Sequence, residues 1–397
     1  MNNITIHRRI MAAICAATLC AILVAGLWPF HAPTNQVNWF KNGNGLHFGD
    51  YGSIVSTGAF MPRSSGRNAS CSIEIWLEPG LTEDSNTFLA FYSAGALSVP
   101  FSLHQSISDL KLQRETLDTN HRAKTVNFFI DDVFREKKPV LVTITSGEQG
   151  TSVYLNGALT KTSPSFGLSD QDLSGRLLVG NSPIANDDWS GRLLGLAIYD
   201  RELTTEQVSG HYEHWTKQGQ PAAAENENTI ALYLFNERRG SVVHNQINPA
   251  TDLLIPERYF VLRAPFLLPV WDEYYPGWGY WKYVGINIAG FIPLGFVFCA
   301  YFSEIKRPVL TSIILGFTVS LSIEVLQAFL PTRDSGTTDI ITNTLGSAIG
   351  AWFCSCSAVQ FMLTRAGLRP ERPKTLYFPA GQVDSGCAHT PNSTVQE

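Results

Sequence analysis

The sequence predicts a protein of two unlike parts, an all-β sandwich outside the membrane and an α-helical bundle of four transmembrane spans. Three observations support this fold class: four long apolar runs, a polar segment with short alternating stretches, and an uneven distribution of charge. Charged residues make up 16% of the 397 residues, against roughly 25% in soluble domains. The deficit lies mainly in the first 30 residues and from residue 284 onward.

Each apolar run approaches or exceeds the roughly 20 residues that a helix needs to cross the hydrocarbon core. The runs are 11–30, 284–302, 309–330 and 340–363, and Glu324 is the only charged residue in them. Buried helices of a soluble protein are the alternative, but three such runs lie close together at the C-terminal end. The other interpretation of the first run is a cleaved signal peptide. Its length and the lack of a clear small-residue cleavage site favour an uncleaved anchor.

Basic residues beside the spans all fall on one side of a four-span arrangement. They are Arg8, Arg9, Lys306, Arg307, Arg365, Arg369, Arg372 and Lys374. This positive-inside pattern predicts a multi-pass protein of the inner (cytoplasmic) membrane. Both termini, residues 1–10 and 364–397, are then cytoplasmic, and the C-terminal tail is predicted to be disordered. Residues 31–283 and the turn 331–338 are predicted to lie outside.

Short alternating stretches separated by turn residues fill the outer segment. Strands are predicted at 71–79, 139–145, 152–155, 189–200, 230–235 and 240–244. Asn156-Gly157 predicts a type I′ hairpin, because both residues tolerate a positive φ angle. A helical turn is predicted at 203–208, with Thr204 or Thr205 as its cap. The many short strands indicate a β-sandwich, which we place at residues 38–250.

Four segments of this sandwich carry a family resemblance. They are SIEIWLEP, PVLVTITSGEQGTSVYLNGALT, GRLLVGN and WSGRLLGLAIYDRELTTEQVSGHY, in this order. Together they resemble the laminin-G or concanavalin A-like jelly roll. The resemblance implies a domain that binds glycans or proteins, in some members through calcium. A calcium site at Asp187 and Asp188 is one interpretation, but we prefer a solvated loop pair. The sequence lacks an E-x-D-x-E pair of catalytic carboxylates, which favours a binding domain over a hydrolase.

Aromatic residues crowd the end of the connector 251–283, which leads into the second span. They are Trp271, Tyr274, Tyr275, Trp278, Tyr280, Trp281 and Tyr283. Trp and Tyr concentrate at membrane–water interfaces, so we predict an interfacial connector. A sugar-stacking platform is the alternative.

Two motifs in the membrane region, NIAGFIPLG at 287–295 and SIEVLQAFLPTRDSGTTDIITNTLGSAIG at 322–350, resemble the VanZ-like family. The resemblance covers the core 284–363 and, more loosely, the first span. It implies an integral membrane protein of a family associated with teicoplanin resistance. No biochemical activity is established for that family, so the resemblance implies no reaction.

Six polar residues in or beside the spans form a predicted membrane pocket in the outer half of the bilayer. They are Asn287, Glu324, Gln327, Arg333, Asp339 and Asn343. At about 100° per residue, Glu324 and Gln327 share one face of the third span, and Asp339 and Asn343 share one face of the fourth.

Two further features concern how these spans meet. Gly346 and Gly350 continue the face of Asp339 and let a neighbouring backbone approach closely. A carboxylate at this depth needs a partner, and Arg333 is the nearest candidate partner of Glu324. The alternative is that the polar groups only fasten the helices together by hydrogen bonds.

These features predict a cell-envelope binding protein with a role in envelope homeostasis or glycopeptide (teicoplanin-type) resistance. Its expected partners are the lipid bilayer, a cell-surface glycan or envelope protein, and a lipid-linked or amphiphilic ligand. The net charge of −5 does not indicate a protein that binds nucleic acid. Of seven cysteines only Cys71 lies in the large polar segment, which excludes a disulfide within it. No catalytic residue, metal or cofactor is assigned.

A membrane enzyme or transporter acting on lipid-linked cell-wall intermediates is the alternative function. Glu324 or Asp339 would then act as general base or metal ligand, and Arg333 as a phosphate clamp.

Overall fold

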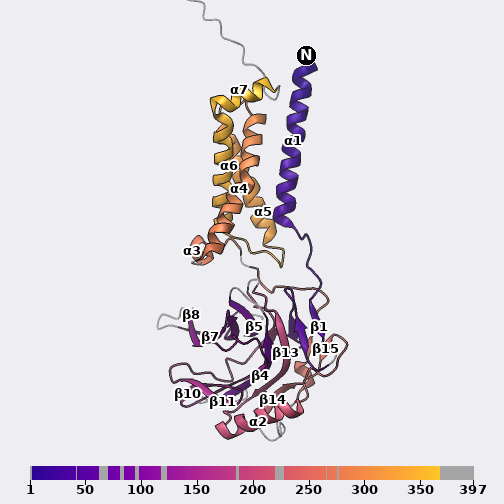
Figure 1. The fold of residues 1–397 in the computed structure, drawn as a ribbon, viewed down its shortest axis with the longest axis vertical. Coiled ribbons are helices and arrows are strands. Elements are labelled where there is room, and N and C mark those ends of the chain that lie inside the picture. The colour runs from indigo at the N-terminus through magenta and orange to yellow at the C-terminus, as the bar shows by residue number, and fades with distance from the viewer. Residues whose placement is uncertain are drawn as a thin grey trace, which may run out of the picture.

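A helix bundle and a β-sandwich lie end to end in the computed structural model of the chain (Figure 1). The structure describes residues 2–41, 43–61, 70–80, 85–93, 98–117, 123–184, 187–219, 228–264, 266–274 and 277–366. One helix of the bundle precedes the sandwich in sequence, and the others follow it. The sandwich is therefore an insertion into the bundle, connected to it by two linkers.

The first sheet of the sandwich has the strand order β1-β2-β13-β4-β9-β10-β11, and β14 also pairs with β13. Its strands are β1 (Val37–Trp39), β2 (Leu46–Phe48), β4 (Cys71–Pro79), β9 (Val140–Gly147), β10 (Gly150–Leu155), β11 (Ala158–Ser163), β13 (Gly191–Tyr199) and β14 (Thr229–Tyr233). The hairpin between β10 and β11 turns at Asn156 and Gly157, whose φ angles are 51° and 81°. Two positive φ angles are the mark of a type I′ turn, so that prediction is confirmed.

The second sheet has the order β15-β16-β3-β12-β5-β6-β7-β8. Its strands are β3 (Ile54–Ser56), β5 (Ser85–Tyr92), β6 (Phe101–Ser106), β7 (Asp109–Leu117), β8 (Ala123–Ile130), β12 (Arg176–Val179), β15 (Val242–Val243) and β16 (Leu253–Leu254). The short 3₁₀-helix η2 (Pro249–Thr251) precedes β16. Because Leu253 pairs with Ser56 of β3, the sandwich extends beyond the predicted limits of 38–250, from Val37 to Leu254.

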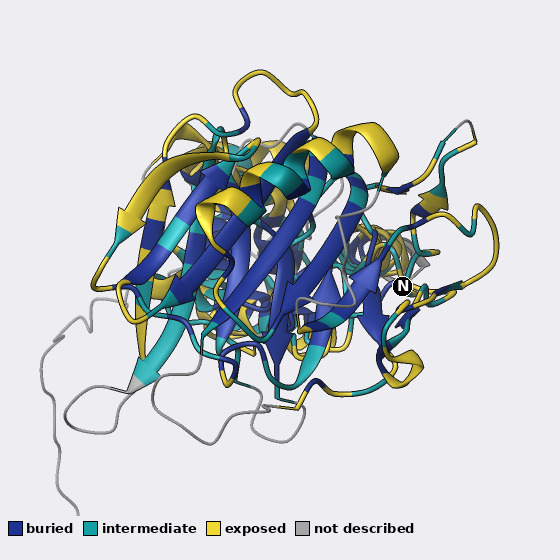
Figure 2. Cartoon of the chain, turned by 90° about the horizontal axis from the view of Figure 1, so that it is seen from below, coloured by how far each residue is buried: buried dark blue, intermediate teal, exposed yellow. Residues whose placement is uncertain are grey.

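Apolar alternation places one face of each sheet in a shared core. On β4, the side chains of Cys71, Ile73, Ile75 and Leu77 face this core and are at most 2% exposed. The intervening residues of β4 point to the opposite face of the first sheet, where Glu74 and Trp76 contact α2 (Thr205–Gln218). Seen from the sandwich end, the strands are largely buried and the outer surface of this helix is exposed (Figure 2).

The helix α2 begins where the sequence predicts a cap but runs further than the predicted single turn. Thr204 is the N-cap, and its capping box with Gln207 satisfies backbone donors of the first turn. Val208, His211 and Trp215 are buried against the first sheet. Gly219 ends the helix in the left-handed conformation, with φ 72°.

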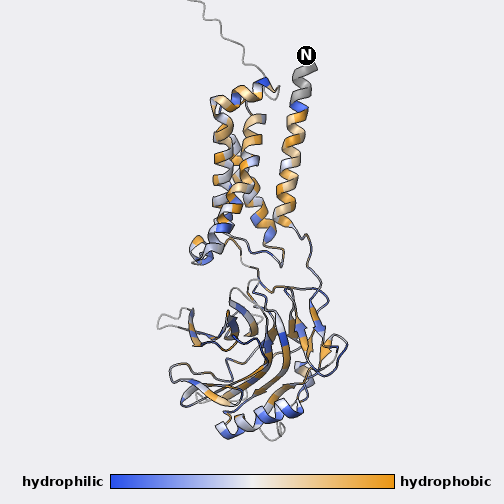
Figure 3. Ribbon diagram, in the orientation of Figure 1, coloured by the Kyte–Doolittle hydropathy of each residue, from blue (hydrophilic) through white to orange (hydrophobic). Residues whose placement is uncertain are grey.

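Four long helices form the bundle: α1 (Asn2–Leu27), α4 (Trp278–Tyr301), α5 (Pro308–Gln327) and α6 (Thr337–Ser355). Two short helices, α3 (Val270–Glu273) and α7 (Ser357–Arg365), lie at opposite ends (Figure 1). Apolar residues dominate the long helices (Figure 3). Three of them are long and apolar enough to cross a membrane, and α6 with α7 makes a fourth if the bent pair counts as one span. The chain is a membrane protein with this helical part in the bilayer.

The fourth predicted span is not one continuous helix over 340–363. It breaks at Cys356, and α7 is bent by 70° from α6. The backbone of Cys356 is extended, with φ −64° and ψ 135°, and this conformation ends the helical pattern. The second span also differs, since α4 begins at Trp278 instead of residue 284. Residues 278–283 of the predicted aromatic connector therefore belong to α4.

The two linkers between bundle and sandwich pair with each other. Thr34 and Arg258 form an antiparallel bridge, and the amide of Tyr259 donates to the carbonyl of Pro33 at 3.0 Å. Further along, Leu268 forms a parallel bridge with Gly336 in the turn between α5 and α6. The sandwich is thus attached to the bundle at α1 and at the N-terminus of α6.

Candidate functional site

Three carboxylates gather where α6 begins, at the end of the bundle that faces the sandwich. They are Glu273 on α3, Glu324 on α5 and Asp339 on α6, here called the carboxylate cluster. Each lies close enough to the others for their negative charges to repel. Glu324 is 1% and Asp339 7% exposed, so most of this charge is held away from water.

Asp339 is held by two residues of α4. The Tyr283 hydroxyl donates to Asp339 Oδ2 and the Asn287 amide to Asp339 Oδ1, each at 2.7 Å. Tyr283 and Asn287 are one helical turn apart, so their side chains reach the same partner. The structure therefore brings two predicted pocket residues, Asn287 and Asp339, into direct contact.

Glu324 accepts a hydrogen bond from the backbone amide of Gly336 at 2.8 Å. That amide belongs to the N-cap residue of α6, where backbone donors lack partners within the helix. The predicted pairing of Glu324 with Arg333 is wrong, since no ion pair among the described residues joins them. Arg333 instead donates to the carbonyl of Trp28, beyond the end of α1, at 2.7 Å, because the turn 331–336 carries it outward toward that linker.

Gln327 and Asn343 serve as interhelical contacts. Gln327 donates to the carbonyl of Gly26 on α1 at 2.9 Å. Asn343 donates to Ser320 Oγ on α5 at 3.0 Å. Of the six predicted pocket residues, Gln327 and Arg333 therefore fasten α1, and the other four lie between α4, α5 and α6.

Glu273 is a site residue that the sequence reasoning missed. Its carboxylate accepts from the Thr338 amide at 2.8 Å and from the Thr338 hydroxyl at 2.5 Å. A Cβ added at Gly336 would lie 1.5 Å from Glu273 Oε1, so a side chain there would displace the Glu273 carboxylate. The available signal was an acidic residue between Trp271 and Tyr274, directly before a span. Tyr283 was noted only as an interfacial aromatic.

Two buried polar atoms continue from the cluster along α6. Asn343 Oδ1 and Ser347 Oγ have no hydrogen-bond partner in the described part of the chain. By the helical rise, they lie about 6 and 12 Å deeper than Asp339. We call the line of Asp339, Asn343 and Ser347 the polar seam.

The two glycines of α6 contact α4. A Cβ at Gly346 would lie 2.2 Å from the carbonyl oxygen of Ile288, and one at Gly350 would lie 2.0 Å from that of Ile292. The α4 and α6 backbones are therefore in direct contact, which small residues permit in membrane helices. The polar seam meets α5, through the bond between Asn343 and Ser320.

The acidic pair of the sandwich loop lies at the junction with the bundle. Asp187 accepts from the Thr87 hydroxyl, and Asp188 from the Tyr259 hydroxyl on the linker. Burial raises the pKa of Asp188 to about 7, and the nearby Asp187, Asp50 and Asp334 add to the rise while the Tyr259 hydrogen bond opposes it. The preferred interpretation of a solvated pair is therefore wrong, because both carboxylates are partly buried and hydrogen-bonded. Among the described residues no group of three or more His, Cys, Asp or Glu is placed to hold a metal.

Comparisons with known proteins match both parts of the chain. The VanZ/LLP1 family model matches residues 214–359, and the model of the concanavalin A-like lectin/glucanases superfamily matches residues 52–209. Both resemblances predicted from the sequence are confirmed. No curated relative matches the chain.

Solved structures also show likeness to the chain. The ligand-binding domain of botulinum neurotoxin serotype D, in complex with N-acetylneuraminic acid, is 15% identical over 48% of this chain and 48% of that chain, with a TM-score of 0.33. The binding domain of Paraclostridial Mosquitocidal Protein 1 is 13% identical over 48% of both chains, with a TM-score of 0.33. The chain thus spans about half the length of these proteins.

Proposed function

We propose that this VanZ-like membrane protein with a concanavalin A-like jelly roll is a binding protein of the cell envelope. The jelly roll binds a saccharide or protein outside the membrane. The carboxylate cluster binds the ammonium group of an envelope lipid headgroup or of another amphiphile. The two sites lie toward the same end of the bundle, so one molecule engages the membrane surface and the envelope beyond it.

The carboxylate cluster is the observation that carries this proposal. Three acids share one site, while Arg333 is the cation that acts on Asp339. The site thus holds more acids than bases, and acids buried together are costly to ionise without a cation. It reaches the surface through the partly exposed Glu273 and through Tyr283, which is 47% exposed. An ammonium group entering there would neutralise the cluster.

The surrounding aromatic residues support a lipid headgroup as the ligand. Trp271, Trp278 and Trp281 are 78%, 83% and 58% exposed. Exposed Trp at the end of a membrane helix marks the depth of the headgroups, and aromatic rings also attract cations. The cluster therefore lies at the level where an amine-bearing headgroup is found.

The bundle also supports the proposed topology, with both termini in the cytoplasm of an inner-membrane protein. Helix α7 with Arg365, and the N-terminal end of α1, lie at the end of the bundle opposite the sandwich (Figure 1). The basic residues then face the cytoplasm. We place the protein in envelope homeostasis or glycopeptide resistance, in keeping with the family.

We favour binding over the enzyme or transporter alternative. That alternative requires Glu324 or Asp339 as a general base or metal ligand. Glu324 and Glu273 hold the first backbone amides of α6. These roles suit a preorganised binding site.

Lipid retention by the full-length protein tests the proposal. The protein would be reconstituted in nanodiscs of phosphatidylethanolamine and phosphatidylglycerol, and the lipids that remain bound measured by native mass spectrometry. We expect preferential retention of phosphatidylethanolamine, reduced about tenfold in Asp339→Asn and Glu273→Gln, since each change removes one charge from the site. Asp272→Asn is the matched control, because Asp272 is an exposed acid on the same short helix. Equal retention of both lipids by the unmodified protein would contradict a cationic ligand.

A further inference from the structure

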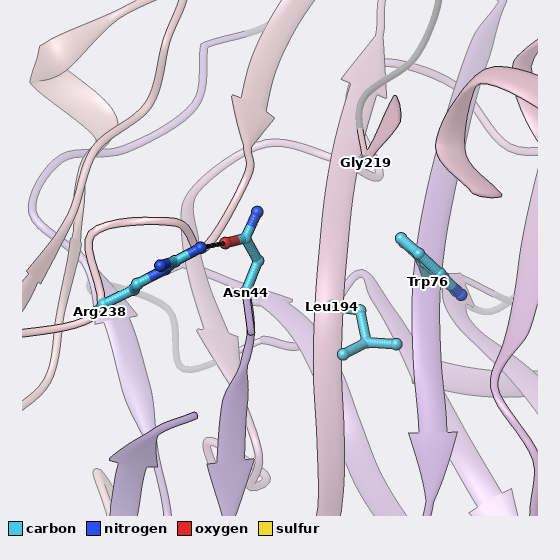
Figure 4. A pocket seen from close by; sticks show the side chains of 5 residues that line it. All are labelled: Asn44, Trp76, Leu194, Gly219 and Arg238. Atoms are coloured by element: carbon cyan, nitrogen blue, oxygen red, sulfur yellow. Dashed lines mark hydrogen bonds between the residues drawn. The ribbon is translucent and has the colours of Figure 1, made fainter. Parts of the chain in front are cut away.

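The jelly roll has a pocket on its outer face, beside the C-terminal end of α2. Its volume is about 330 Å³, and Asn44, Trp76, Leu194, Gly219 and Arg238 line it. Figure 4 shows Trp76 and Leu194 on neighbouring strands, with Asn44 and Arg238 together on one side. This is the face that α2 covers in part, and it lies away from the helix bundle (Figure 1).

The Trp76 ring is a fixed and partly exposed aromatic surface. Trp215 of α2 lies beside it, with ring centroids 6.2 Å apart. Trp215 is itself fully buried, and a Cβ at Gly195 would lie 2.4 Å from its ring. Gly195 therefore makes room for Trp215, which in turn positions Trp76 at the pocket.

A strand irregularity places Leu194 in the same pocket. The pairing of β13 with β4 shifts register between Leu193 and Gly195, which pair with Leu77 and Trp76. Leu194 is the extra residue at this point. Such bulges redirect a side chain and are frequent at binding sites. The apolar part of the pocket is thus one indole ring and one leucine.

The opposite side of the pocket is polar and positively charged. Arg238 donates to Asn44 Oδ1 at 3.3 Å, and no ion pair among the described residues involves Arg238. Arg192, two residues before Leu194 on β13, contrasts with it. Arg192 pairs with Glu78 at 3.0 Å and lies 4.6 Å from the centre of the Phe40 ring. Arg238 therefore presents guanidinium donors that no described carboxylate engages.

We propose that this pocket binds an acidic saccharide, a pyranose ring that carries a carboxylate. The apolar C–H face of the sugar packs on Trp76 and Leu194. Its carboxylate pairs with Arg238, whose planar donors match a carboxylate, and its hydroxyls bond to the Asn44 amide. This inference rests on the proposed saccharide-binding function of the jelly roll and assigns that function a place and a ligand class.

The size and position of the pocket agree with this ligand. A volume of about 330 Å³ is at the small end of ligand pockets, which range from about 300 to 1,000 Å³. It suits one sugar unit of a polymer better than a long stretch of chain. Because the pocket faces away from the bundle, an extended envelope polymer can reach it without approaching the lipid surface.

Titration of the full-length protein in nanodiscs with defined oligosaccharides tests this site. The probes are oligogalacturonates and the same oligomers after reduction of their carboxyl groups to alcohols. We expect the acidic oligomers to bind and the reduced ones to bind at least about tenfold more weakly. Trp76→Ala should weaken binding of the acidic oligomers by about tenfold or more, and Trp76→Phe should retain most of it. Arg238→Gln should abolish the preference for the acidic form.

Trp271→Ala is the matched control, an exposed tryptophan outside the pocket that belongs to the alternative aromatic platform. Loss of binding in Trp271→Ala but not in Trp76→Ala would overturn the pocket as the site. Equal binding of acidic and reduced oligomers would overturn the ligand class. If the unmodified protein binds no oligosaccharide of a broad panel, the saccharide-binding function itself is wrong, and the inference falls with it. Thermal unfolding of each variant shows whether a loss reflects folding.

Discussion

Two buried glutamates, one in each part of the molecule, have opposite surroundings. Glu74 in the sandwich is 0% exposed and Glu324 in the bundle 1%. Glu74 accepts from Tyr199 at 2.9 Å, from Trp215 at 3.0 Å and lies 3.0 Å from His211 Nδ1. All three neighbours are groups that can donate a hydrogen bond, and two of them, His211 and Trp215, fix α2 on the sheet.

Glu324 has fewer donors and two acidic neighbours. One backbone amide, that of Gly336, donates to it at 2.8 Å, while Glu273 and Asp339 repel its charge. A buried charge is stabilising when its neighbours complement it and costly when they do not. The comparison teaches that Glu74 stabilises the sandwich, whereas Glu324 contributes an acid to the carboxylate cluster at a cost in the free energy of folding. Matched substitutions by glutamine separate these two roles.

The largest expected effect on stability is that of Glu74→Gln. Glutamine replaces one carboxylate oxygen by an NH2 donor and removes the charge, which weakens the hydrogen bonds from the Tyr199 hydroxyl and the Trp215 indole N–H. We expect a loss of about 2–4 kcal/mol in the free energy of unfolding of the sandwich, measured by thermal unfolding and limited proteolysis. Glu78→Gln is the control on the same strand, because its partner Arg192 is 43% exposed and the loss should stay below about 1 kcal/mol. Equal losses of stability in Glu74→Gln and Glu78→Gln would show that the buried contacts of Glu74 contribute no more than an exposed ion pair.

The substitution Asp188→Asn, at the junction of sandwich and bundle, should have an intermediate effect on stability that depends on pH. The pKa of Asp188 is raised from the ordinary value of 3.8 to about 7, so the folded protein holds the proton over a range in which the unfolded chain releases it. Stability contributed by the protonated form is full below pH 3.8 and is lost as the pH rises toward 7, by up to about 1.4 kcal/mol per pH unit. Asp188→Asn should flatten this slope in melting temperatures recorded between pH 5 and pH 8. An unchanged slope would show that Asp188 is not the titrating group.

The smallest effect on stability should come from Glu324→Gln. The change removes a charge from an acidic cluster, which offsets the weaker bond to Gly336, and we expect a shift within about 1 kcal/mol in either direction. Retention of phosphatidylethanolamine should nevertheless fall about tenfold, as for Asp339→Asn. If Glu324→Gln destabilises the protein as strongly as Glu74→Gln, the two glutamates share a structural role and the comparison fails.

Turns, caps and long apolar helices could be predicted from the sequence because each is determined by neighbouring residues in the chain. The hairpin at Asn156-Gly157, the cap at Thr204 and the long apolar runs each depend on a few adjacent residues. The break at Cys356 was missed because the apolar run continues across it with no proline or glycine to mark the end of a helix. The short strand β16 was missed since two residues carry no periodicity, and only pairing with β3 defines it.

The candidate site was predictable in part. Helical spacing placed Glu324, Asp339 and Asn343 on inward faces, and all three are buried. Helical spacing could not predict that Glu273 joins the cluster or that Arg333 points toward Trp28. Both placements depend on how the linker at Leu268 pairs with Gly336. That pairing joins residues 68 positions apart and has no local signature.

The two attachments of the sandwich limit its rotation. A domain on a single linker can swivel freely about the membrane normal. Here the first linker leaves α1, and the second leads into α3 and pairs at Leu268 with Gly336 before α6. The bridge between Thr34 and Arg258 joins the two linkers. Torsional freedom is therefore lost, and the direction in which the outer face of the jelly roll points is set by the helices. In every copy of the protein, the outer face of the jelly roll would therefore point in the same direction relative to its own helix bundle.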